Sequence, residues 1–179
     1  MRKKKSSALS RLQYRVGREA EEEICYSLKF IHGERNVSHD VRYIDGTNGH
    51  PDIKLKIDGN LFFVEVKSII PFVKTTIKSG ITLRTNSVKF NRLSYSRLVR
   101  NAKGKRACIV LIVNLRLSNK TLNFILDNDE LLDFFSKSNA LWVHIPLHYL
   151  LNYAKVTELE RKDFIYKPVE TRQVVLINE

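Results

Sequence analysis

Two acidic residues and a lysine in the first third of the chain have the side-chain types that divalent-metal chemistry requires. Asp52 follows Pro51, Glu65 comes after twelve intervening residues, and Lys67 lies two positions further on. Carboxylate oxygens, together with water, are the ligands that suit Mg²⁺ or Mn²⁺, and a nearby lysine adds a positive charge. The set predicts a divalent-cation site, with a solvated strand face as the alternative.

The sequence between these residues predicts a β-hairpin that brings the two carboxylates together. Asp58-Gly59 is a strong two-residue turn signal, and with that loop the residues paired across the hairpin have numbers that sum to 117. Asp52 then lies opposite Glu65, with Cβ atoms about 5 Å apart, and Lys67 shares their face. A four-residue loop keeps this register, whereas a three-residue loop places the carboxylates on opposite faces. The other face of the hairpin supplies apolar core residues: Ile53, Leu55, Phe62 and Val64.

The close carboxylate pair also carries a resemblance to a known family. Two ionised carboxylates about 5 Å apart repel by about 3 kcal/mol at an effective dielectric constant of about 20, so a shared proton, a cation or screening water must accompany them. Pro51-Asp52 followed by Glu65-Val66-Lys67 resembles the PD-(D/E)xK nuclease signature on its hairpin. The resemblance implies that the acidic pair binds a divalent metal and that Lys67 positions or activates the attacking water.

A predicted first helix, from Ser10 to about Phe30, adds a third carboxylate. Gly17 and Glu21 resemble the Gly-x-x-x-Glu pattern of archaeal Holliday-junction resolvases, which implies that Glu21 joins the metal site, with Glu22 as the alternative. An exposed acidic face with ion pairs to neighbouring arginines, Arg15 or Arg18, is the other interpretation. The buried stripe of this helix is expected to be Leu9, Leu12, Val16, Ala20, Ile24 and Leu28.

Composition restricts the class of partner. The 179 residues suit one domain, and 43% hydrophobic residues with seven glycines and four prolines indicate a globular chain. The net charge is +12, from 31 basic against 19 acidic residues, which favours a polyanion such as DNA or RNA. No apolar run reaches the roughly 20 residues of a membrane span, and no signal-peptide pattern is present, so we expect no membrane partner.

The cysteine content predicts the compartment. Cys25 and Cys108 lie in apolar surroundings far apart in the sequence and are expected to be buried free thiols, which suggests a cytoplasmic protein. Two cysteines also cannot ligate an iron–sulfur cluster, which excludes nuclease branches that depend on one.

The predicted elements give an α/β fold with a central mixed sheet flanked by helices. We expect a basic flexible arm at 1–9, a nuclease core at 10–115 and a C-terminal addition at 116–179 packed on the same domain. Ala107–Leu115 reads as a strand buried on both faces, and the resemblance implies a restriction-endonuclease-like core. Further expected elements are strands at 37–43, 121–126, 141–145 and 174–177 (the last an added strand or a dimer contact), a loop at 45–49, and helices at 128–135 and after Pro146.

A second helix is expected to bind DNA. Asn86 or Ser87 could cap a helix over Val88–Ala102, with Phe90, Leu93 and Leu98 facing inward. Its other face is rich in cations and has no acid, which favours phosphate binding over a simple solvated face. The seven cations are Lys89, Arg92, Arg97, Arg100, Lys103, Lys105 and Arg106. His144 and His148 are spaced for one helical face, but Pro146 between them argues against a metal pair.

Together these patterns predict a Mg²⁺-dependent DNA endonuclease. Asp52 and Glu65 would hold one or two Mg²⁺ ions (or Mn²⁺), with Glu21 as a further ligand, directly or through water. Lys67 would orient the attacking water or neutralise the transition state. The resolvase likeness implies a homodimer acting on branched or double-stranded DNA. A non-catalytic DNA-binding module, a restriction or nicking-type enzyme, and an RNA endonuclease are the alternatives.

Overall fold

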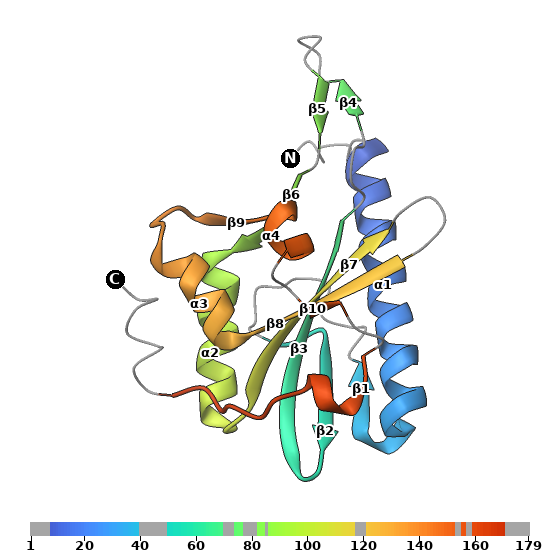
Figure 1. Cartoon of the computed structure of the whole chain (residues 1–179), viewed down its shortest axis with the longest axis vertical. Helices are drawn as coiled ribbons and strands as arrows, with labels where there is room; N and C mark the ends of the chain where they lie inside the picture. Colours follow the sequence, from blue (N-terminus) through green and yellow to red (C-terminus); the bar gives the residue numbers. More distant parts are fainter. Residues whose placement is uncertain are drawn as a thin grey trace, which may run out of the picture.

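The fold is built around a central mixed sheet on which the helices pack (Figure 1). The computed structural model describes residues 8–39, 50–69, 74–76, 82–84, 86–116, 121–152, 155–156 and 159–170 of the chain. The sheet has six strands in the order β1-β2-β3-β7-β8-β10. Their bounds are Val37–His39, Ile53–Ile57, Asn60–Ile69, Cys108–Arg116, Thr121–Asp127 and Lys155–Val156.

The buried strand predicted at 107–115 is confirmed as β7. It pairs parallel with β3 and antiparallel with β8, and residues 108–115 are all buried. Helices cover both faces of the sheet, so the predicted mixed sheet flanked by helices is confirmed as well (Figure 1).

Helix α1 (Ala8–His32) packs along one face of the sheet through its apolar stripe. Four predicted stripe residues are buried: Val16, Ala20, Ile24 and Leu28. The side chains of Leu9 and Leu12 lie outside the described part. The stripe belongs to the same core as the apolar face predicted for the hairpin, namely Ile53, Leu55, Phe62 and Val64.

Helices α2 (Arg92–Gly104) and α3 (Asn128–Ser136) cover the opposite face. Their contact includes Tyr95 stacked on Phe135, with ring centroids 4.2 Å apart, and the buried Tyr95 hydroxyl donating to Asn128 Oδ1 at 2.7 Å. The predicted helix at 128–135 is confirmed, but its N-cap is Asp127, whose capping box includes Glu130.

The β2–β3 hairpin has the predicted register. Ile53 pairs with Val64 and Ile57 with Asn60. Asp58 and Gly59 have φ angles of 51° and 81°, as a two-residue turn of this kind requires. This alignment positions Asp52 opposite Glu65.

The second helix begins later than predicted. Residues 87–91 form strand β6 (Ser87–Asn91), and α2 starts at Arg92 with the Asn91 side chain as its cap. The helix over Val88–Ala102 was therefore wrong in its first turn, because Val88 and Phe90 alternate with exposed Lys89 and pair with β9. Leu93, expected inside, is 57% exposed.

Strand β9 (Trp142–Pro146) corresponds to the predicted strand at 141–145 and forms a separate two-stranded sheet with β6. Helix α4 (Leu147–Asn152) follows directly. The remaining elements are β4 (Lys74–Thr76), which pairs with β5 (Thr82–Arg84), and the 3-10 helices η1 (Glu34–Asn36) and η2 (Arg161–Asp163).

The C-terminal part packs on the same body. Phe164 and Val169 are buried, and the Val169 N–H donates to the Ala107 carbonyl at 3.2 Å. Cys25 and Cys108 are buried free thiols, as predicted. Of the expected arm, residues 8–9 begin α1 and residues 1–7 fall outside the described part, as do the loop at 45–49 and the strand at 174–177. Among the described helices, none is both long and apolar enough for a membrane span.

Candidate active site

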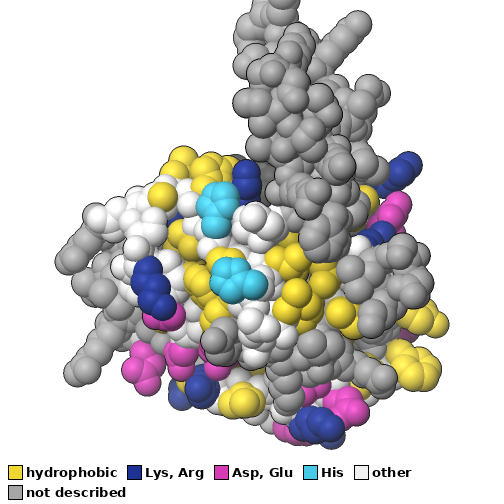
Figure 2. Space-filling model, turned by 45° about the horizontal axis from the view of Figure 1, so that its top comes forward, with side chains coloured by type: hydrophobic (Ala, Val, Ile, Leu, Met, Phe, Trp, Pro, Cys, Tyr) yellow, Lys and Arg dark blue, Asp and Glu magenta, His cyan; other side chains and the backbone are white. Residues whose placement is uncertain are grey.

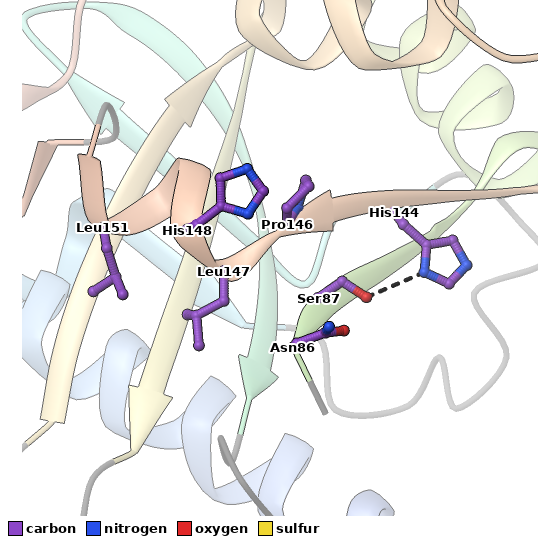
Figure 3. Close-up of a pocket in the computed structure, with 7 residues that line it drawn as sticks. All are labelled: Asn86, Ser87, His144, Pro146, Leu147, His148 and Leu151. Carbon is purple, nitrogen blue, oxygen red and sulfur yellow. Dashed lines mark hydrogen bonds between the residues drawn. The ribbon is translucent and has the colours of Figure 1, made fainter. Parts of the chain in front are cut away.

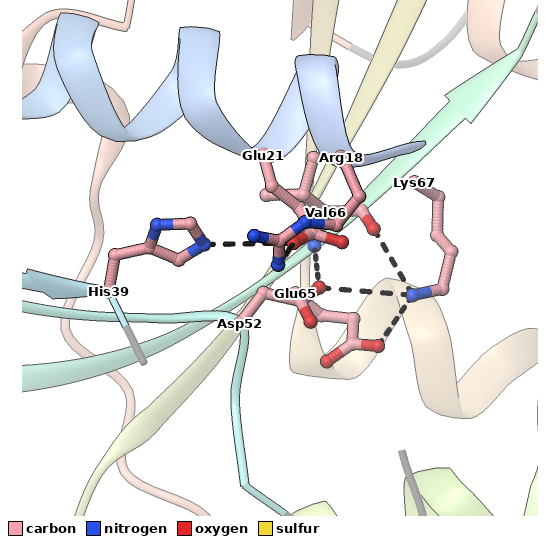
Figure 4. A network of polar contacts seen from close by, with 7 residues as sticks. All are labelled: Arg18, Glu21, His39, Asp52, Glu65, Val66 and Lys67. Atoms are coloured by element: carbon pink, nitrogen blue, oxygen red, sulfur yellow. Dashed lines mark hydrogen bonds and ion pairs between the residues drawn. The ribbon is translucent and has the colours of Figure 1, made fainter. Parts of the chain in front are cut away.

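The predicted site residues meet where β2 begins, beside β3 (Figure 4). Strand β2 begins only at Ile53, which pairs with Val64. The backbone ladder therefore stops before Val66, and the Asp52 side chain takes its place: Oδ2 accepts the Val66 N–H at 2.8 Å. This bond fixes the Asp52 carboxylate at the edge of β3.

Lys67 bridges the acidic pair. Its Nζ donates to Glu65 Oε1 at 2.5 Å and to the Val66 carbonyl at 3.1 Å, and lies 3.9 Å from Asp52 Oδ2. One ammonium group thus sits among three oxygens from two carboxylates and the main chain. The Lys67 ammonium also lies 5.3 Å from the centre of the Phe90 ring, so β6 closes one side of the site.

Glu21 reaches the same place from α1. This helix packs on the sheet face opposite to the one that bears Glu65. The Glu21 side chain therefore approaches the other site residues beside the N-terminal end of β2 (Figure 4). Its Oε2 lies 3.3 Å from an Arg18 guanidinium nitrogen and 3.6 Å from His39 Nε2. The predicted convergence of Glu21, Asp52, Glu65 and Lys67 is therefore present in the structure.

Burial makes two carboxylates of this cluster, Glu21 and Glu65, hard to ionise. Burial, and then repulsion by Asp52, raises the pKa of Glu21 to about 7, and Arg18 opposes this only in part. Burial and Asp52 also raise the pKa of Glu65, against the pull of its partner Lys67. Two acidic groups whose pKa values are strongly raised at one place make this cluster a candidate functional site.

The pKa values of two basic residues in the cluster, Lys67 and His39, shift in opposite directions. Burial alone would lower the pKa of Lys67, but ion pairing with Glu65 and then Asp52 outweighs it and raises that pKa above its ordinary value. Burial and the nearby Arg18 charge lower the pKa of His39, so the imidazole is neutral near pH 7. Lys67 is thus a permanent cation, and His39 a neutral hydrogen-bonding group.

Sequence reasoning missed His39 and considered Arg18 only as a partner in an exposed ion pair. His39 ends the short strand β1, two residues after the buried Val37, so it faces inward with it. That period-two spacing was the available signal, but the partner on α1 lies eighteen positions away in sequence. Arg18 does pair with Glu21 and also with Glu22, at 3.9 Å.

The donor set fits a hard divalent cation. Within the described ranges no three His, Cys, Asp or Glu side chains already stand close enough together to hold a metal ion. The three oxygens around the Lys67 ammonium nevertheless accept a cation, and carboxylate and carbonyl oxygens are the ligands that Mg²⁺ and Mn²⁺ prefer. Asp52, Glu65 and the Val66 carbonyl are the residues that would hold the metal, with Glu21 beside them.

The seven predicted DNA-binding cations do not form one helix face. Lys89 is exposed on β6, whereas Lys105 lies over the Phe63 ring at 5.7 Å. Arg92 donates through Nε and Nη2 to the carbonyls of Phe135, near the end of α3, and of Ser138 and Ala140, which follow it. Arg92 therefore stabilises this turn of the chain. The remaining four lie on or just after α2: Arg97, Arg100, Lys103 and Arg106.

Comparison with known proteins found no family model and no curated protein that matches the chain.

Proposed function

We propose that this protein is a Mg²⁺-dependent DNA endonuclease with a restriction-endonuclease-like core. The observation that supports it most is the Lys67 ammonium surrounded by Glu65, Asp52 and the Val66 carbonyl, with Glu21 reaching the same point. A net charge of +12 favours a polyanionic substrate. An intracellular homodimer that cuts branched or double-stranded DNA is the form we propose, since Gly17 and Glu21 resemble the junction resolvases.

Each residue has a distinct part in this proposal. Asp52, held by the Val66 N–H, and Glu65 would hold Mg²⁺, which when bound lowers the pKa of a coordinated water and stabilises charge on the phosphate. Lys67 keeps its positive charge and donates to the attacking water or to a phosphate oxygen. Glu21 accepts a hydrogen bond from the same water, while Arg18 and His39 position its carboxylate.

One observation favours a second candidate, a DNA-binding module that does no chemistry. Lys67 already pairs with Glu65 at 2.5 Å, so part of the carboxylate charge is neutralised by the chain itself. Two features weigh against this candidate. Three acidic residues converge with the lysine, and burial keeps the pKa of two of them raised, which a purely structural ion pair does not require.

Cleavage of a labelled DNA panel tests the proposal. Four-way junction, flap, duplex and single-stranded DNA are incubated with Mg²⁺, Mn²⁺ or EDTA. We expect metal-dependent cutting that is lost in Asp52→Asn and Glu65→Gln and kept in Asp58→Asn. Asp58 is a matched control because it is an exposed aspartate at the tip of the same hairpin. Tight binding without cutting under any metal would support the second candidate instead.

A further inference from the structure

A pocket of about 500 Å³ opens beside the N-terminal end of β6, outside the carboxylate cluster (Figure 3). It lies between β6, the end of β9 and α4. Its lining divides into polar side chains and an apolar part: Asn86, Ser87, His144 and His148 in the first group, and Pro146, Leu147 and Leu151 in the second. Figure 2 shows histidine side chains on one face of the molecule, with hydrophobic side chains beside them.

The chemistry of this lining suits a flat ring with a polar edge. Leucine and proline carbons can pack against the faces of such a ring, and imidazole rings also stack on bases. The Asn86 amide offers both a donor and an acceptor, and the Ser87 hydroxyl lies 3.1 Å from His144 Nδ1. None of the residues that line the pocket is acidic, so an anionic ligand is not repelled from within it.

The exposed face of the β6–β9 sheet next to the pocket also carries side chains that suit a nucleic acid. In the β6–β9 pair Lys89 lies opposite His144 and Asn91 opposite Trp142, while Val88 and Phe90 point into the core. Lys89 and His144 are exposed, and Trp142 is 51% exposed. An exposed aromatic ring with a neighbouring lysine is the combination by which proteins hold single-stranded nucleic acid.

Strand β6 links this surface to the carboxylate cluster. Phe90, on the inner side of β6, lies 5.3 Å from the Lys67 ammonium. Ser87 at the pocket is three residues earlier, which is about 10 Å along a strand. Strand β6 therefore faces the carboxylate cluster with its inner side and borders the pocket on its other side, about 10 Å away along the strand.

We infer that this pocket takes an unpaired nucleobase, so that the preferred substrate is DNA in which a single-stranded segment adjoins a duplex. The inference rests on the proposed nuclease function for the nature of the ligand. The base packs against Leu147 and Leu151 and uses Asn86 and His148 at its edge, while Lys89 contacts a phosphate and Trp142 stacks on the next base.

Binding of fluorescein-labelled DNA tests the inference in EDTA, where hydrolysis plays no part. Three DNA ligands contain the same duplex. The first is blunt-ended, the second has an eight-nucleotide thymine overhang, and the third has an abasic overhang of the same length that keeps every phosphate. We expect anisotropy titrations to show at least about tenfold tighter binding to the thymine overhang than to the other two. The chain has a single tryptophan, Trp142, and its fluorescence should fall with the thymine overhang alone.

A matched pair of variants locates the effect. Leu151→Glu places a charge in the pocket, and Leu93→Glu places the same charge on α2 outside it. The two leucines are 54% and 57% exposed, so neither variant disturbs the core. We expect only Leu151→Glu to lose the preference for the thymine overhang. Equal affinity for the thymine and abasic overhangs, or an unchanged preference in Leu151→Glu, would overturn the inference. Because no cleavage is measured, a failure of the nuclease proposal would appear in the cleavage assay and not here.

Discussion

Two acidic clusters each contain glutamates from α1, and they differ in how the negative charge is balanced. The outer cluster is Glu19 and Glu23 with Arg116, whose guanidinium nitrogens lie 2.8 and 3.1 Å from the two carboxylates. The inner cluster is Glu21, Asp52 and Glu65 with Lys67, which lie near one another at the N-terminal end of β2. The outer carboxylates are 47% and 42% exposed, whereas those of the inner cluster are between 16% and 24% exposed.

This difference separates a structural ion pair from a candidate site. Water and Arg116 together screen the outer cluster, which ties α1 to the end of β7 at little electrostatic cost. The inner cluster holds three carboxylates at a place with less water, and the pKa of two of them is raised as a result. A protein retains such an arrangement where a cation or a reacting group is to be bound.

The largest expected difference between the clusters is in catalysis. Asp52→Asn should lower the rate of DNA cleavage by at least about a thousandfold, because metal binding contributes several kcal/mol to the transition state. The variant keeps an oxygen that can accept the Val66 N–H, so it should fold normally. Glu19→Gln, in the outer cluster, should change the rate by less than about threefold. Single-turnover cleavage at saturating enzyme measures both, and circular dichroism controls for folding. A similar loss in both variants would remove the distinction between the clusters.

The next difference should be in the free energy of unfolding lost when the central cation of each cluster, Lys67 or Arg116, is removed. Lys67→Met keeps the stem but leaves Glu65 and Asp52 without their common cation. The Lys67–Glu65 pair is only partly buried, so its loss should cost about 2 kcal/mol, between the values typical of exposed and of buried pairs. Arg116→Met breaks more exposed pairs and should cost less than about 1 kcal/mol. Urea unfolding at pH 8 in EDTA gives both values of the free energy of unfolding. Added Mg²⁺ should restore part of the loss in Lys67→Met and none in Arg116→Met. Equal losses would mean that Lys67 is no more than a surface partner.

The inner cluster was easier to predict than its surroundings because its geometry is local. Asp58-Gly59 and the period of two determine which residues face each other, and thirteen positions separate Asp52 from Glu65. Glu21 followed from a helical motif. The structure brings these residues together.

What the sequence did not reveal depends on partners far along the chain. Strand β6 resembles the first turn of a helix until it is paired with β9, more than fifty residues later. Arg92 looks like a phosphate-binding cation until the carbonyls that follow α3 are placed beside it. Arg116 is nearly a hundred positions from the glutamates that it joins. Local periodicity contains no information about such contacts.

A further effect should appear when stability is followed against pH. The folded-state pKa of Glu21 is about 7, above its ordinary 4.5, so between these values the folded state binds more protons than the unfolded state. Stability therefore falls as pH rises through this window. Glu21→Gln should match the wild type near pH 4.5 and be more stable by about 3 kcal/mol at pH 8, since each unit of pKa difference corresponds to about 1.4 kcal/mol. Thermal unfolding from pH 4.5 to 8 in EDTA provides the comparison, with Glu19→Gln as the outer-cluster control. A wild type that gains stability relative to Glu21→Gln above pH 7 would contradict the raised pKa.

The smallest expected effect concerns His39, which contacts Glu21 without a strong hydrogen bond. Its Nε2 lies 3.6 Å from Glu21 Oε2, its side chain is 10% exposed, and its lowered pKa leaves it neutral near pH 7. In the proposed function Glu21 binds the attacking water at the metal site, and groups that orient such outer partners of a metal tune its affinity. His39→Gln should therefore raise the Mg²⁺ concentration needed for half-maximal cleavage by about threefold and leave the rate at saturating Mg²⁺ nearly unchanged. Arg15→Gln is the matched change beside the outer cluster, where Arg15 lies 3.6 Å from Glu19, and should alter neither quantity. A fall in the saturated rate of His39→Gln, with no change in its Mg²⁺ requirement, would instead place the imidazole in contact with the reacting phosphate.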